Sequence, residues 1–113
     1  MSDCLFCAIV AGDIPATVVL ETDDVVAFRD ISPQAPTHVV VVPRAHHADA
    51  AALAAADPAL AGRLLAAGAA VADAEGLSDG YRFVLNTGRD GGQTVFHVHL
   101  HVLGGRPLTW PPG

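Results

Sequence analysis

The segment HVHLHVLGG, residues 97–105, alternates three histidines with three apolar residues. Successive side chains of a β-strand point to opposite faces, so this alternation predicts a strand with one imidazole face and one apolar face. His97, His99 and His101 are expected on the first face, and the apolar residues between them in the core. Alternate Cα atoms of a strand are roughly 6.6 Å apart, so the outer histidines lie roughly 13 Å apart. We therefore do not expect one metal ion to bind all three.

Two kinds of chemistry remain open for this row of histidines. A His-x-His pair can supply two ligands to a catalytic metal, with a third ligand from elsewhere. Alternatively, neutral imidazoles can act as nucleophile, acid and hydrogen-bond donor at one phosphorus centre. The neighbouring loop NTGRDGGQT favours phosphate chemistry, because Gly92 lets the backbone approach an oxyanion closely. Its neutral hydrogen-bond donors are Asn86, Gln93 and Thr94.

The pattern of the whole chain predicts an α+β fold. Asp3 and Gly12 bound a short N-terminal helix, and Asp57-Pro58 begins a longer helix with an apolar stripe. The expected elements are a helix over 4–11, strands over 16–21, 25–30 and 37–43, a helix over 58–75, and strands over 81–86 and 94–103. This order lacks regular βαβ alternation and predicts a five-stranded antiparallel sheet with one short N-terminal helix and one long central helix. The proline-containing tail over 106–113 is expected to be irregular.

Composition excludes several classes of function. The chain has 113 residues, enough for one domain with its own core. Twelve acidic against six basic residues give a net charge of −6, which disfavours long nucleic acid as a partner. Charged residues and a proline interrupt the longest apolar stretch, residues 50–74, which argues against a membrane span. The start MSDCLFC lacks the basic residues of a secretory signal, so we expect a cytoplasmic protein.

Cys4 and Cys7 form a Cys-x-x-Cys pair and are the two cysteines of the chain. Three interpretations are open: two buried thiols on a short helix, a redox-active disulfide, or half of a structural zinc site. A thioredoxin-like redox motif follows a β-strand, and no strand is expected before this pair. A zinc site needs two further ligands, which histidines can supply.

Several segments together resemble the histidine triad (HIT) family, in particular its Hint branch of nucleoside phosphoramidases. HVHLHVLGG matches the His-x-His-x-His row of the family with the Gly-Gly continuation of that branch. FRDISPQAPTHVVVVPRAHH, GGQTVFHVHLHVLGG and the terminal WPPG resemble Hint-branch segments in the same order. The resemblance spans nearly the whole chain and implies a single HIT domain over residues 1–113.

In that family the middle histidine of the row is the nucleophile, which here is His99. The resemblance implies a hydrolase of purine nucleoside phosphoramidates. An imidazole nitrogen attacks the α-phosphorus, an amine leaves, and water releases AMP or GMP from a nucleotidyl-histidine. His101 and His38 match the accompanying histidines, which donate to the phosphoryl oxygens and help protonate the amine. Nucleotidyltransferase relatives carry Gln at the position of His101, so this histidine favours hydrolysis.

The resemblance also implies how a purine nucleotide binds. Asn86, Gly92 and Thr94 match positions of the phosphate pocket, where Gln93 is expected to add a donor, and the Hint branch often has serine in place of Thr94. Asp30 is expected to accept hydrogen bonds from both ribose hydroxyls. The apolar slot for the purine is expected from Leu5, Phe6, Ile9, Phe28 and Ile31.

Many bacterial members of the family complete a Cys-x-x-Cys pair with the histidine of a P-basic-x-H segment and the first histidine of the row. The implied ligands of a structural zinc are therefore Cys4, Cys7, His46 and His97, with His47 as the alternative to His46. No cofactor is implied for the catalysis itself.

The family resemblance also implies a homodimer. The alanine-rich helix from Pro58 has little polar cover, which permits the close approach of a second copy. Trp110 resembles a tail residue that reaches toward the partner's active site. Three other functions remain open: a dinucleoside polyphosphate hydrolase of the same family, a nucleotide-binding or scaffold module with incidental hydrolysis, and a His-x-His metalloenzyme.

Overall fold

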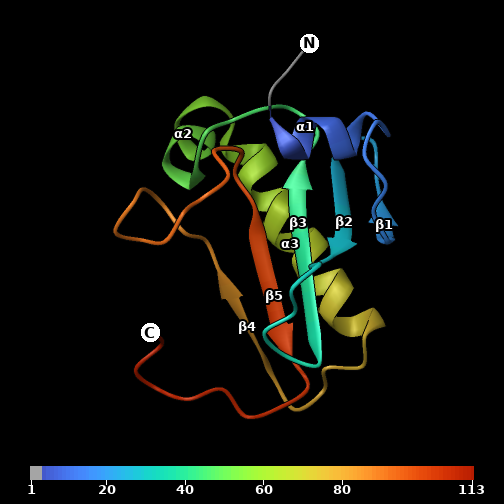
Figure 1. Cartoon of the computed structure of the whole chain (residues 1–113), viewed down its shortest axis with the longest axis vertical. Helices are drawn as coiled ribbons and strands as arrows, with labels where there is room; N and C mark the ends of the chain where they lie inside the picture. Colours follow the sequence, from blue (N-terminus) through green and yellow to red (C-terminus); the bar gives the residue numbers. More distant parts are fainter. Residues whose placement is uncertain (1–3) are drawn as a thin grey trace.

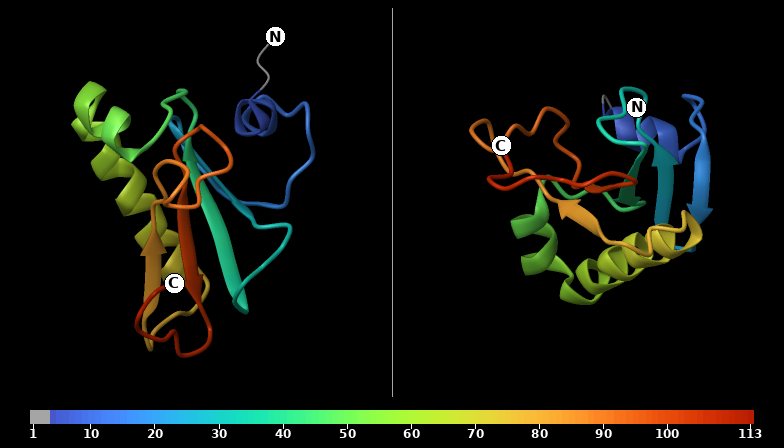
Figure 2. Two further views of the ribbon diagram at one scale, coloured as in Figure 1. Left: turned by 60° about the vertical axis from the view of Figure 1, so that its left-hand side comes forward. Right: turned by 90° about the horizontal axis from the view of Figure 1, so that it is seen from below.

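The structure, a computed structural model, describes residues 4–113. The fold contains a five-stranded antiparallel sheet, as the sequence predicts, and its strand order is β1-β2-β3-β5-β4. The strands are β1 (Val18–Glu21), β2 (Val25–Arg29), β3 (Thr37–Pro43), β4 (Tyr81–Val84) and β5 (Leu100–Gly104). The helices are α1 (Leu5–Val10), α2 (Ala50–Ala56) and α3 (Pro58–Ala74). Figures 1 and 2 show α2 and α3 on one side of the sheet and α1 on the other.

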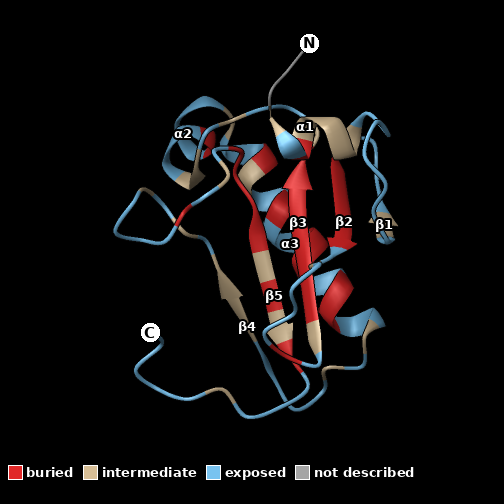
Figure 3. Ribbon diagram, viewed as in Figure 1, coloured by how far each residue is buried: buried red, intermediate tan, exposed pale blue. Residues whose placement is uncertain are grey.

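Each face of the sheet has its own apolar core. Under α2 and α3, apolar residues of β2, β3 and β5 pack with Leu53, Leu64 and Val71. On the opposite face, a smaller core beneath α1 consists of Phe6, Val26, Phe28, Val40 and Val42. Figure 3 shows that the central strands are buried and the C-terminal tail is exposed. Among residues 4–113, none of the helices combines the length and the apolar content needed to cross a membrane.

The expected long helix is confirmed as α3. The Asp57 side chain accepts a hydrogen bond from the Leu60 N–H at 3.1 Å and caps its N-terminus, and Gly76 follows its end with φ +72°. The structure also contains α2, which was not expected from the sequence. The Asp49 side chain caps this helix by accepting a hydrogen bond from the Ala52 N–H at 2.8 Å. An acidic residue followed by a run of alanines is the signal that marks this helix. The predicted cap Asp3 lies outside the described residues.

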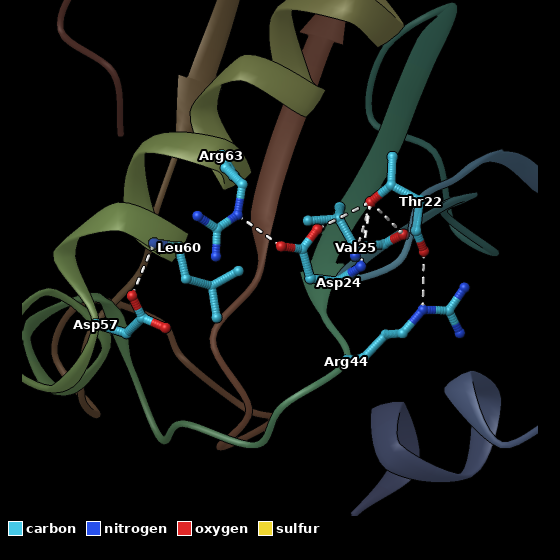
Figure 4. Close-up of polar contacts among 7 residues, drawn as sticks. All are labelled: Thr22, Asp24, Val25, Arg44, Asp57, Leu60 and Arg63. Carbon is cyan, nitrogen blue, oxygen red and sulfur yellow. Dashed lines mark hydrogen bonds and ion pairs between the residues drawn. The ribbon is translucent and has the colours of Figure 1, made fainter.

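A polar cluster ties α3 and the end of β3 to the turn between β1 and β2 (Figure 4). The Arg63 guanidinium of α3 donates to Asp24 at 2.6 Å. Arg44, which follows β3, donates to the Thr22 carbonyl at 3.0 Å. These bonds fix the point at which the chain leaves β3 and enters the segment that carries His46.

The predicted strand over 94–103 is wrong in its first half, because β5 begins at Leu100. Of the three histidines in the row, only His101 lies in a strand. The ladder between β3 and β5 ends at the pair Val41 and Leu100. Before this pair, the Val98 N–H donates to the His47 carbonyl at 2.7 Å, which replaces a ladder bond. The predicted alternation survives, since Val98 packs in the core under α3 while the histidines face the other way.

Candidate active site

His99 lies just before β5 and is only 8% exposed. Its Nδ1 is 2.8 Å from the His97 carbonyl oxygen. A carbonyl oxygen only accepts hydrogen bonds, so Nδ1 carries the proton and donates, and in the neutral ring Nε2 keeps its lone pair. The Phe6 ring of α1 packs edge-on against the imidazole, with ring centroids 4.9 Å apart. The surrounding structure therefore fixes both the orientation of the ring and the tautomer that leaves a lone pair on Nε2.

A second chain of hydrogen bonds sets the tautomers of His38 and His101. The backbone N–H of Gln34 donates to His38 Nδ1 at 3.0 Å, so the proton of the neutral His38 ring lies on Nε2. That nitrogen is 2.8 Å from His101 Nδ1 and donates to it. His101 consequently carries its proton on Nε2 and can donate. Its ring lies beside that of His99, with centroids 5.0 Å apart, so a nucleophilic nitrogen and a hydrogen-bond donor are neighbours.

Burial keeps this pair of rings neutral at neutral pH. It lowers the pKa of His38, although the nearby Asp30 carboxylate acts in the opposite direction. The pKa of His101 falls to about 4, first through burial and then through the charges of His99 and His38. The hydrogen bonds from Gln34 to His38 and from His38 to His101 both require neutral rings, because each needs an unprotonated Nδ1 as the acceptor.

Asp30 follows β2 and faces the same group of histidines. One carboxylate oxygen is 3.5 Å from His38 Nε2, and the other accepts from the Ser32 N–H at 2.8 Å. The carboxylate is therefore held in place at the end of the sheet beside His38. It remains partly exposed, so it keeps capacity to accept further hydrogen bonds from a ligand.

The structure brings together part of the predicted purine slot. The rings of Phe6 and Phe28 pack edge-on, 5.5 Å apart, and both are buried between α1 and the sheet. Ile9 packs against the same core. Leu5 is exposed, and Ile31 is 98% exposed. The two phenylalanines are thus core residues, whereas Leu5 and Ile31 are exposed apolar residues.

The loop between β4 and β5 contains the predicted phosphate-binding residues. Asn86 is half-buried, Thr94 is exposed, and Gly92 has φ +85°, a conformation that favours glycine. Gln93 differs from the prediction. Its side chain is buried and bonded to three backbone groups of the protein itself, so its predicted role as a donor to the ligand is wrong. In the tail, Trp110 is 82% exposed, and the Arg82 guanidinium donates to the Thr109 carbonyl at 2.9 Å.

Cys4, Cys7, His46 and His97 form a cluster whose potential ligand atoms all lie within 4.8 Å of one another. Their Sγ–Nδ1 distances are 3.4 Å for Cys4 to His97, for Cys7 to His97 and for Cys7 to His46. Tetrahedral zinc, with bonds of about 2.3 Å to sulfur and about 2.0 Å to nitrogen, places such atoms about 3.5 Å apart.

The orientation of His97 also fits a metal ligand. Its Nε2 is 2.8 Å from the Pro43 carbonyl and donates to it, which leaves the Nδ1 lone pair directed at the thiols. The four residues therefore fit a structural zinc in donor type and spacing, and the backbone bond of His97 holds its ring in the orientation a ligand needs. Among residues 4–113, it is His46, and not His47, that joins this group of potential ligands.

A second group of potential ligands, Asp30, His38 and His101, fits a metal less well. The two nitrogens that face each other, on His38 and His101, are 2.8 Å apart, a hydrogen-bond distance. Two nitrogen ligands of one tetrahedral zinc would lie about 3.3 Å apart. This spacing favours a hydrogen-bonded pair of rings.

Two backbone groups of the site could not be predicted from the sequence. The His97 carbonyl fixes the tautomer of His99, and the Gln34 N–H fixes that of His38. Every residue apart from proline carries the same main-chain groups, so no side-chain pattern could have marked these two.

Comparisons with known proteins show the family to which the chain belongs. A model of the HIT domain family matches residues 11–108. The 14 kDa zinc-binding protein of Zea mays is 47% identical over 115 residues, covering 99% of this chain and 89% of that protein. The adenylylsulfatase HINT1 of Arabidopsis thaliana is 44% identical, covering 99% of this chain and 78% of that protein.

Solved structures show the same fold. The crystal structure of a HIT family hydrolase from Legionella pneumophila superimposes with a TM-score of 0.94 at 51% sequence identity, covering 98% of this chain and 100% of that chain. The chain therefore belongs to the histidine triad (HIT) family and has the fold of a HIT family hydrolase.

Proposed function

We propose that the protein hydrolyses purine nucleoside phosphoramidates through a covalent nucleotidyl-His99 intermediate. The observation that carries this proposal is the 2.8 Å hydrogen bond from His99 Nδ1 to the His97 carbonyl, which leaves the lone pair on Nε2. The inferred N–H of His101 beside that ring adds a donor for a phosphoryl oxygen or a leaving group.

The reaction divides into two displacements at the α-phosphorus. His99 Nε2 forms a P–N bond while the P–N bond to the amine breaks, and the amine leaves after taking up a proton. Water then attacks the same phosphorus, the His99–phosphorus bond breaks, and the nucleoside monophosphate leaves. His101, hydrogen-bonded to His38, is placed to donate to the phosphoryl oxygens or to the departing group. Neither step requires a redox cofactor.

Nucleotide contacts follow from the residues around His99. Asp30 is assigned to the ribose hydroxyls, and Asn86, Gly92 and Thr94 to the phosphate. The exposed Leu5 and Ile31 are assigned to the purine, with Phe6, Ile9 and Phe28 supporting that surface from behind. The half-buried Asp30 carboxylate beside His38 supports the ribose assignment.

A second substrate uses the same attacking atom. The Arabidopsis relative is named an adenylylsulfatase, which favours sulfate as an alternative leaving group on the same phosphorus. In that reaction His99 would break a P–O bond, and the neutral His101 N–H would face the departing anion. Adenylyl sulfate therefore belongs in the test of the proposed function.

We also propose that Cys4, Cys7, His46 and His97 bind a structural zinc. When bound, the metal supplies a cross-link between α1 and the segment that precedes His99. Sγ–N distances of 3.4 Å and the backbone bond of His97 support the assignment, as does the name of the maize relative. No step of the proposed reaction passes through this metal.

A homodimer completes the proposal. β4 forms one edge of the sheet, and Tyr81 on it and Leu65 on α3 are exposed apolar residues. Pairing of two β4 edges about a twofold axis would cover this surface. The exposed Trp110 in the tail is assigned to the partner's active site.

The deciding experiment measures AMP release from adenosine 5′-phosphoramidate and from adenylyl sulfate, by wild type and by His99→Ala, with and without EDTA. We expect wild-type turnover that survives EDTA while the protein stays folded. His99→Ala should lower kcat at least about a thousandfold, because it removes the nucleophile.

Other outcomes point to the alternatives. Tight nucleotide binding without turnover would favour a binding module. Activity lost to EDTA in a folded protein would favour a catalytic metal. Diadenosine polyphosphates cleaved much faster than the phosphoramidate would favour the dinucleoside polyphosphate hydrolase.

A further inference from the structure

Gln93 is a buried polar residue whose whole carboxamide is used within the protein. It is 5% exposed. Its Oε1 accepts from the Gly88 N–H at 2.9 Å, and its Nε2 donates to the Ala48 carbonyl at 2.7 Å and to the Val95 carbonyl at 3.1 Å. The Gln93 backbone N–H also donates to the Gly88 carbonyl at 3.0 Å. One side chain thus closes the glycine-rich loop and ties it to a distant segment.

The segments joined by Gln93 are those that build the site. Ala48 follows the stretch with the metal-ligand candidate His46, and the neighbouring His47 carbonyl holds the Val98 N–H at 2.7 Å. Val95 lies in the segment that leads to His99. Residues 88–93, between β4 and β5, form the loop whose Gly92 is assigned to the phosphate (Figure 1).

We propose that Gln93 is a positioning residue for phosphate recognition: it holds the loop of residues 88–93 at a fixed place relative to the proposed nucleophile His99. The proposal rests on the proposed function, because it names a supporting residue of the same site. Gln93 itself does not touch the substrate. It acts through the loop, whose backbone must be in place before the phosphate arrives.

The chemistry at this position requires a carboxamide. Three backbone groups, one donor and two acceptors, converge on the side chain, and an amide matches all three. Glutamate would keep the acceptor for Gly88 but would place a carboxylate against two carbonyl oxygens. Methionine has a similar length but would leave all three backbone groups without their partner.

The test compares Gln93→Met and Gln93→Glu with Val71→Ala as a matched control. Val71 lies in the core under α3, on the other face of the sheet, so Val71→Ala lowers stability without touching the loop. Hydrogen exchange of the Gly88 amide is measured by NMR in the absence of ligand. Dissociation constants for AMP and adenosine, and kcat and KM for adenosine 5′-phosphoramidate, are then measured for each variant.

In Gln93→Met we expect exchange of the Gly88 amide to rise at least about tenfold, since its acceptor is gone. AMP binding should weaken about tenfold and kcat should fall by a similar or larger factor, while adenosine, which lacks the phosphate, binds as in wild type. Gln93→Glu should protect the Gly88 amide better than Gln93→Met does, and should still lose AMP affinity. Val71→Ala should leave the ratio of AMP to adenosine affinity unchanged.

If the ratio of the AMP and adenosine dissociation constants stays unchanged in both folded Gln93 variants, the positioning role is overturned. An equal loss of affinity for the two ligands is one way in which the ratio stays unchanged. If Gln93→Met does not fold, the ratio in Gln93→Glu decides. The proposed reaction fails separately: wild type that binds AMP but releases none from the phosphoramidate overturns that reaction, while the affinity ratio still tests Gln93.

Discussion

His97 contacts both the cysteine cluster and His99, through different atoms. Its ring Nδ1 faces the thiols of Cys4 and Cys7, and its backbone carbonyl accepts a hydrogen bond from His99 Nδ1. Contacts that hold the His97 ring in place therefore also restrain the His97 carbonyl. That carbonyl selects the tautomer of His99, the proposed nucleophile. In the proposed function the alternating histidines divide their tasks in order along the chain, the first to the zinc cluster and the next two to the reaction.

His101 makes stability depend on pH. Its folded pKa, about 4, is lower than that of an exposed histidine, so between roughly pH 4 and 6.5 the unfolded chain binds more protons than the folded one. The free energy of unfolding should therefore fall as pH decreases through this window and be unaffected above it. We expect His101 to account for about 1–2 kcal/mol, less than the full linkage value because the ring is partly exposed.

Urea denaturation between pH 4 and 8 tests this expectation. His101→Gln should have a shallower pH dependence than wild type between pH 4.5 and 6.5. Parallel curves for the two proteins would show that the imidazole titrates normally in the folded state.

At the scale of elements, α3 lies close to the sheet because Gly68 faces it. A Cβ built at this glycine would lie 2.6 Å from Leu100 Cδ2 and 2.9 Å from Phe83 Cζ. Leu100 is fully buried and directly precedes His101, so the packing of α3 also supports the strand that carries this proposed catalytic residue. By contrast, a Cβ at Gly62 on the same helix would meet nothing within 4 Å.

These two glycines give a matched pair of substitutions with opposite signs. Gly68→Ala should destabilise the protein by about 1–2 kcal/mol, because overpacking outweighs the gain in helix propensity. Gly62→Ala should stabilise it by up to about 1 kcal/mol. Equilibrium denaturation measures both. Stabilisation by Gly68→Ala would contradict this expectation. It would mean that the Leu100 and Phe83 side chains move away from the new methyl group without a loss of folding free energy.

At the scale of the whole molecule, the two faces of the sheet have separate tasks. The face under α2 and α3 holds the larger core, and the opposite face holds the histidines and α1. The β4 edge lies at the end of the sheet next to β5, so a partner paired there would approach the strand of His101. The net charge of −6 keeps the surface unsuited to long polyanions without preventing binding of one nucleotide.

The proposed dimer predicts a mass in solution of twice the 11.6 kDa chain. Ala69 is exposed and lines the same surface depression as Tyr81 of the edge strand, so Ala69→Arg should shift the protein toward monomer. Ala70, its neighbour on α3, is also exposed but faces the side of Val19 and Leu20, so Ala70→Arg should leave the dimer intact. Light scattering coupled to size-exclusion chromatography distinguishes these outcomes. A monomeric wild type at micromolar concentration would contradict the proposal.

The sequence by itself determined the fold class, the order of the five strands along the chain, and α3 with its Asp57 cap, because periodicity, turns and caps are local signals. It also determined which residue types were available for chemistry. The first half of the expected strand over 94–103 was wrong because the Val98 N–H donates to the His47 carbonyl in place of a ladder bond, and the Pro43 carbonyl accepts from the His97 side chain. Those partners are far away in sequence, and local periodicity does not report them.

Only the tertiary structure decided how the chemical residues are used. It turned Gln93 inward, put His46 into the cysteine cluster, and left Ile31 at the surface. It also set the tautomers of His38 and His99 through backbone groups that are identical in nearly every residue. A sequence pattern can name an imidazole, but the nitrogen that carries its proton depends on which distant backbone atom lies within hydrogen-bond distance.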